Sequence, residues 1–101
     1  MPAPRGHPAV DAEIREATRS HEERCPGLGD EFIEAVRRAV CAATRAPSRC
    51  AVRFADIRRL KLRRFPYSVW FFMHGQTVYV LTVLHNKRDN RAVLAAKRNE
   101  V

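Results

Sequence analysis

The sequence predicts an α+β fold, in which an antiparallel helical hairpin packs on a small antiparallel β-sheet and a short helix follows. Apolar residues recur every three or four positions in the first half, and the period falls to two after Pro47. Two apolar runs, 67–74 and 77–84, flank a turn that contains glycine. A chain of 101 residues has room for one core, so we expect a single domain over residues 1–101.

The first half predicts two helices. The apolar positions of residues 10–24 share one face, and they are Val10, Ile14, Ala17 and His21. Pro26 and Gly27 end this helix, because proline breaks the hydrogen-bond ladder and glycine turns with positive φ. Asp30 is expected to cap a second helix that extends to about residue 46. Helices joined by so short a loop lie antiparallel.

The second half predicts strands with unusual faces. In residues 57–65, Leu60 and Leu62 alternate with basic residues, which gives one strand a basic side. The hairpin that follows is largely apolar on both faces, and in its second strand one face is expected to hold Val78, Val80, Thr82 and Leu84 and the other Thr77, Tyr79, Leu81 and Val83. Since the helices cover only one face, the other needs the C-terminal segment, a second subunit or a partner chain. A short helix capped by Asp89 would supply part of that cover through Ala92, Val93, Ala95 and Ala96.

The net charge of +8 is concentrated in the second half. Residues 1–46 carry 7 basic and 8 acidic side chains, whereas residues 47–101 carry 12 and 3. Such a field attracts nucleic acid or an acidic protein surface, or serves only solubility. No apolar run of about 20 residues exists, so no membrane-spanning helix is expected. The start lacks a signal core and the three cysteines form no pair motif, which favours a cytoplasmic protein without metal or cofactor.

Three segments carry a family resemblance: PGLGDEFIEAV, RRFPY and VLHNKRD. In this order and spacing they resemble the ParE/RelE superfamily of bacterial type II toxins, over about residues 7–98. The resemblance implies a growth-inhibiting toxin that is held silent by a cognate antitoxin, whose disordered tail folds over the toxin. The family usually opens with a strand. Residues 1–8 hold three prolines and a glycine, so we expect this segment to be irregular or to lack the strand.

The resemblance also separates two activities. RelE-like members cleave messenger RNA on the ribosome, and many use an arginine and a tyrosine at positions where this chain has Ser68 and Leu94. His85 could replace a lost base, although a histidine at a strand end is more often structural. ParE-like members act by binding, as a class against DNA gyrase, and this sequence is closer to them. We therefore expect a binding toxin with no catalytic residue, with a ribosome-dependent mRNA endoribonuclease as the alternative.

Two sets of candidate contacts follow from these patterns. The cations and one histidine are assigned to the target or to nucleic acid, and they are Lys61, Arg63, Arg64, His85, Lys87, Arg88 and Arg91. We expect those of the strand and of the C-terminal segment to form one continuous patch. The hairpin residues assigned to the antitoxin are Trp70, Phe72, Tyr79 and Leu81. A homodimer or the C-terminal helix would bury the same four side chains instead.

Overall fold

The computed structural model describes residues 3–88 and 91–101, so Asp89, the predicted helix cap, lies outside the described residues. Its elements are β1 (Arg5–Gly6), α1 (Val10–Arg24), α2 (Leu28–Arg45), a 3₁₀ turn (Pro47–Arg49), β2 (Val52–Phe54), β3 (Ile57–Lys61), β4 (Tyr67–His74), β5 (Thr77–His85) and α3 (Arg91–Asn99). The strands form one sheet in the order β1-β5-β4-β3-β2. All neighbours are antiparallel except β1 and β5. None of the helices in the described part combines the length and apolar character needed to cross a membrane.

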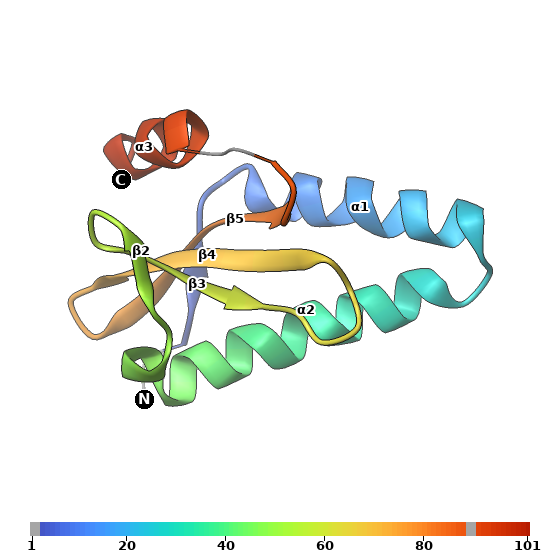
Figure 1. Ribbon diagram of the computed structural model, residues 1–101, viewed down its shortest axis with the longest axis horizontal. Coiled ribbons are helices and arrows are strands. Elements are labelled where there is room, and N and C mark those ends of the chain that lie inside the picture. Colours follow the sequence, from blue (N-terminus) through green and yellow to red (C-terminus); the bar gives the residue numbers. More distant parts are fainter. Residues whose placement is uncertain (1–2, 89–90) are drawn as a thin grey trace.

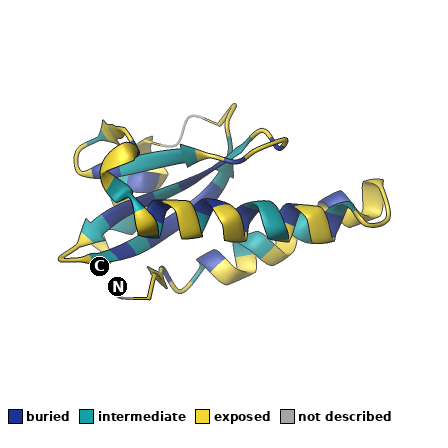
Figure 2. Cartoon of the chain, turned by 90° about the horizontal axis from the view of Figure 1, so that it is seen from below, coloured by how far each residue is buried: buried dark blue, intermediate teal, exposed yellow. Residues whose placement is uncertain are grey.

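The helical hairpin and α3 pack on opposite faces of the sheet. α1 runs outward and α2 returns beside it (Figure 1). Figure 2 shows buried positions recurring along the helices between exposed ones, as an amphipathic pattern requires. The core between the helical hairpin and the sheet includes Phe32 of α2 with Val69 and Phe71 of β4. A smaller core under α3 joins Leu94 to the other face of the sheet.

The start of α2 differs from the prediction, because Asp30 is not its cap. The cap position is Gly27, three residues earlier, which has a φ of 90°, and the helix begins at Leu28. The carboxylate of Glu22, from α1, accepts the backbone N–H of Gly27 at 3.0 and 3.1 Å and that of Gly29 at 3.0 Å. These are helix-terminal N–H groups that no backbone carbonyl would otherwise satisfy. The cap therefore comes from the other helix of the hairpin, which a local sequence pattern does not reveal.

The sheet has a short strand at each edge that was not expected from the sequence. Residues 5 and 6, expected to be irregular, form β1 and pair in parallel with Tyr79 and Val80 of β5. At the other edge, β2 folds back on β3 through a turn in which Ala55 adopts a φ of 53°. Strands of two and three residues are too short to show a period of two, so their sequence gave no signal.

A β-bulge breaks the alternation predicted for β5. Trp70 pairs with Thr82, but the next residue, Phe71, pairs with Val80, which leaves Leu81 as the extra residue. Val80 and Val83 consequently both pack toward the helical hairpin. The predicted faces, with Val80 and Thr82 on one side and Val83 on the other, are therefore wrong beyond Leu81.

The C-terminal helix is the cover of the second apolar face, although a different residue provides the contact. Leu94 is 1% exposed, whereas Val93, predicted to pack, is 44% exposed. The guanidinium of Arg98 lies 3.7 Å from the ring centre of Phe72 and pairs with Asp56 at 2.9 Å. Further pairs join Lys97 to Glu13 of α1 and Glu100 to His7. One buried side chain and a set of polar contacts thus hold α3 on the sheet.

Candidate functional site

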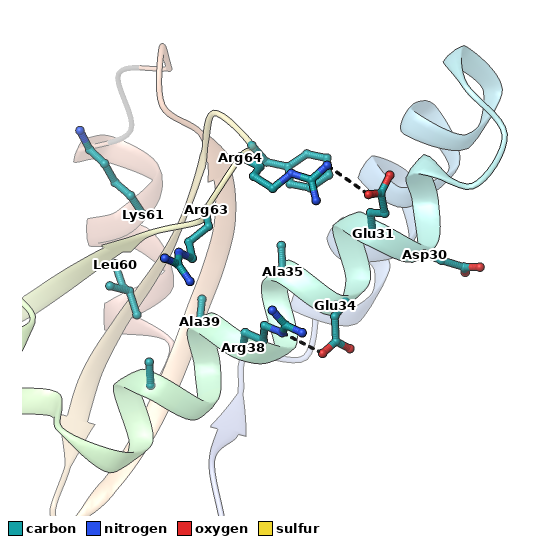
Figure 3. A pocket seen from close by; sticks show the side chains of 12 residues that line it. Asp30, Glu31, Glu34, Ala35, Arg38, Ala39, Leu60, Lys61, Arg63 and Arg64 are labelled. Carbon is teal, nitrogen blue, oxygen red and sulfur yellow. Dashed lines mark hydrogen bonds and ion pairs between the residues drawn. The ribbon is translucent and has the colours of Figure 1, made fainter.

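A groove of about 740 Å³ lies between α2 and the segment that runs from β3 toward β4 (Figure 3). Its apolar lining consists of Ala35, Ala39 and Ala42 from α2 with Leu60 and Phe65 from the facing segment. Spacings of four and three place these alanines on one face of α2, and their methyl groups leave the space open. The sequence prediction missed this groove. The alanine repeat was the signal that could have revealed it.

The rim of the groove is charged on both sides. On the α2 side, Arg38 pairs with Glu34 at 3.1 Å, and Glu31 pairs with Arg64 at 3.2 Å. Figure 3 shows Arg63 turned toward α2, while Lys61 points away from the helix. Neither of these two cations forms an ion pair with any residue that the structure describes. The strand side of the rim therefore offers unpaired positive charge.

The outer edge of β3 is open beside the groove. β2 pairs with Ile57 and Arg58 only, and the N–H of Arg59 still donates to Ala51 at 3.2 Å. Beyond that point no strand within the described ranges covers the outer edge, where Lys61 lies. An unpaired edge presents backbone N–H and C=O groups to any extended segment that approaches it.

The C-terminal cations do not form the single patch that the sequence predicts. Strand register brings Lys61, opposite Ser68, and His85, opposite Tyr67, to the same end of the sheet. Lys87 and Arg88 follow directly and are exposed. Arg91, by contrast, lies with its guanidinium 5.5 Å from the ring centre of Phe54 in β2, which pairs with the far end of β3.

The four hairpin residues assigned to the antitoxin fall into two groups. Phe72 and Leu81 have no exposed surface, because Leu94 of α3 packs on them. Trp70 and Tyr79 remain half-buried at the margin of that cluster. The guanidinium of Arg59 lies 5.6 Å from the ring centre of Trp70, and burial, with a contribution from Arg53, lowers the pKa of Arg59. Only Trp70 and Tyr79 stay accessible to a partner while α3 is in place.

The two positions at which RelE-like members carry catalytic groups lie in the interior of this chain. Ser68 is fully buried and donates a hydrogen bond from Oγ to Oδ1 of Asn86 at 2.5 Å. Leu94 is the buried residue of α3. His85, at the end of β5, accepts the N–H of Lys87 at Nδ1. Across residues 3–88 and 91–101, no cluster of three His, Cys, Asp or Glu side chains could hold a metal ion.

One comparison bears directly on the fold. The chain superposes on a chain of the solved structure entitled "Chromosomal ParDE TA system from P. aeruginosa" with a TM-score of 0.73. The match covers 84% of this chain and 96% of the other, at 16% sequence identity. This chain has a ParE-like fold. The α+β architecture and the fold that the resemblance implies are therefore confirmed. No protein-family model and no curated protein matches the chain.

Proposed function

We propose that this protein is the toxin of a type II toxin–antitoxin pair, which inhibits growth by binding a cellular target and is neutralised by a cognate antitoxin. The observation that carries the proposal is an apolar groove with an unpaired basic rim, in a chain that shares its fold with one from a ParDE system. An amphipathic, acidic segment that folds on binding has the chemistry that such a groove accepts.

The antitoxin is assigned to the groove and to the open edge of β3, so Lys61 and Arg63, which were assigned to the target from sequence, become antitoxin contacts in this proposal. Apolar side chains of the antitoxin lie against Ala35 and Ala39, and its carboxylates pair with Lys61 and Arg63. Burial of about 500 Å² of apolar surface would contribute on the order of 10 kcal/mol before the cost of ordering the segment. Phe72 and Leu81, assigned to the antitoxin from sequence, take no part in the proposed contact while α3 stays docked.

Target inhibition is assigned to binding through the exposed cations of the C-terminal segment, Lys87 and Arg88. The interior placement of Ser68 and Leu94 supports binding over cleavage, because a general acid or base must contact the substrate and both side chains are buried. DNA gyrase is the target that the family resemblance suggests. The ribosome with messenger RNA is the alternative, and primer extension after induction separates the two, since only the alternative produces ribosome-phased cuts.

Two matched charge reversals test the proposal. The protein is co-expressed with the product of its neighbouring gene, and capture is measured together with growth. Arg63→Glu should weaken capture because it places an anion on the groove rim, whereas Lys87→Glu, an equal charge change, should preserve capture and reduce toxicity. Equal capture of both variants would remove the groove from the contact. Full toxicity of a folded Lys87→Glu protein would remove that residue from target binding.

A further inference from the structure

A second cavity, of about 510 Å³, lies where the end of α1 meets the start of β4 and the end of β5. Its volume falls within the range of sites that hold small molecules. His21, Phe65, Tyr67 and His85 form its walls, and Arg24 and Arg64 contribute charge. The contacts proposed for the antitoxin and the target leave this cavity unused, apart from Arg64 and Phe65, which also line the groove.

The walls of this cavity are a set of rings held in fixed mutual orientations. His21 meets Phe65 edge-on at 5.3 Å between ring centres and Tyr67 at 5.4 Å. Tyr67 in turn meets His85 edge-on at 5.2 Å. β4, β5 and the buried side of α1 carry Tyr67, His85 and His21, whereas Phe65 belongs to the bend between β3 and β4, where it is buried. Such walls suit a flat, aromatic ligand, which gains contact area without a large ordering cost.

Two imidazoles supply complementary polar groups. His21 is 7% exposed and donates from Nδ1 to the carbonyl of Ala17 at 2.7 Å, so Nε2 of the neutral ring is an acceptor. That atom has no hydrogen-bond partner among the residues described. His85 accepts the N–H of Lys87 at Nδ1, at 3.1 Å, so its neutral ring carries the proton on Nε2 and donates there. The cavity therefore presents one acceptor and one donor.

Two guanidinium groups supply the charge. Arg24, in the last turn of α1, is exposed and makes no ion pair within the described part of the chain. Arg64 is exposed and pairs with Glu31 through Nη2 at 3.2 Å, which leaves its other N–H groups to donate. Arginine binds phosphate in a forked geometry, with charge-assisted hydrogen bonds. A carboxylate alone would use these arginines and leave the aromatic walls and both imidazoles without a partner.

We propose that this cavity binds a nucleotide unit, that is, a planar base that carries a phosphate. The base lies against Tyr67 and His85, its edge exchanges hydrogen bonds with His21 and His85, and the phosphate pairs with Arg24 and Arg64. A free mononucleotide and an exposed nucleotide of a single-stranded nucleic acid share this chemistry. The site adjoins the groove and shares Arg64 and Phe65 with it, but the proposed base and phosphate contacts do not involve the alanine face of α2 or the edge of β3.

The test is an NMR titration of the ¹⁵N-labelled full chain with AMP and UMP, and with adenosine and ribose 5-phosphate as partial ligands. We expect a nucleotide to cause saturable shifts at Tyr67 and His85. Each partial ligand should bind with an affinity at least about tenfold lower. Absence of saturable shifts for both nucleotides up to about 10 mM overturns the proposal. Binding of ribose 5-phosphate as tight as that of AMP also overturns it, since the site would then recognise an anion only.

Two variants test where the nucleotide binds, and an oligonucleotide tests whether the natural ligand is a free nucleotide or a single-stranded nucleic acid. Arg24→Glu should weaken AMP binding about tenfold or more, because it replaces a phosphate partner by a repelling charge. Arg15→Glu, an equal charge change at an exposed position of the same helix, should leave it unchanged. Equal effects of both variants contradict the site. If a short 5′-phosphorylated single strand binds more tightly than AMP, the site is supported and is assigned to nucleic acid. If the strand and AMP bind with equal affinity, the site is supported and is assigned to free nucleotides.

Discussion

Replacing Leu94 by alanine tests whether a single apolar side chain anchors α3 to the sheet. Leu94 is 1% exposed and packs with Ile57, Phe72 and Leu81. Truncation of such a leucine costs about 2–5 kcal/mol, because transfer free energy is lost and a cavity remains. The neighbouring Val93 is 44% exposed, so Val93→Ala on the same helix should change the unfolding free energy by no more than about 0.5 kcal/mol.

Urea unfolding, followed by circular dichroism and by the fluorescence of Trp70, measures both variants. Trp70 is the only tryptophan and packs against the cluster under α3, so its emission reports on this face. In a domain whose whole stability is about 5–15 kcal/mol, the expected loss for Leu94→Ala is a large fraction. Each kcal/mol should also lower Tm by about 4–8 °C. Equal unfolding midpoints for Leu94→Ala and Val93→Ala would refute the docking of α3 described above.

Two further predictions concern the cap of α2 and the ion pair of α3. Glu22→Ala should lower the unfolding free energy by about 0.5–2 kcal/mol, because a helix cap is lost. Glu23 is exposed in the same turn, so Glu23→Ala should have little effect. Equal unfolding free energies of the two variants in urea melts would contradict the cap. The hydrogen bond from Arg98 lowers the pKa of Asp56 below its ordinary 3.8. The ionised carboxylate therefore stabilises the fold above pH 3.8, and this contribution is lost as the pH falls through the pKa of the folded state. The Tm difference between the wild type and Asp56→Asn should thus be present at neutral pH and vanish in acid, and a difference that persists unchanged in strong acid would contradict the pair.

Elements with long, repeated patterns could be predicted from sequence. The first helix was expected at 10–24 and is α1 (Val10–Arg24), because four turns of apolar spacing leave little ambiguity. The hairpin strands were expected from residues 67 and 77 and begin there, since a glycine turn separates two runs of β-forming residues. Both signals are local, and each extends over enough residues to outweigh single exceptions.

Features that depend on contacts between distant segments could not be predicted. The cap from Glu22 requires α1 and α2 to lie side by side, and the bulge at Leu81 is set by pairing with β4. α3 packs through Leu94 because the cavity it fills is built by three strands, whereas its own sequence offers Val93 equally well. For the same reason, the sequence did not reveal that α3 buries the candidate contacts Phe72 and Leu81. The hydrophobic pattern indicates that a surface will be covered but does not name the segment that covers it.

The most direct test of the central claim is a growth measurement on cells that express this chain from an inducible promoter, alone and together with its neighbouring gene. A toxin that binds its target should arrest growth when it is made alone, and the neighbour should restore growth through the groove. With Arg63→Glu, arrest should persist even when the neighbour is present, because neutralisation and not toxicity is weakened. Normal growth of cells that accumulate the folded wild-type chain alone would contradict the account.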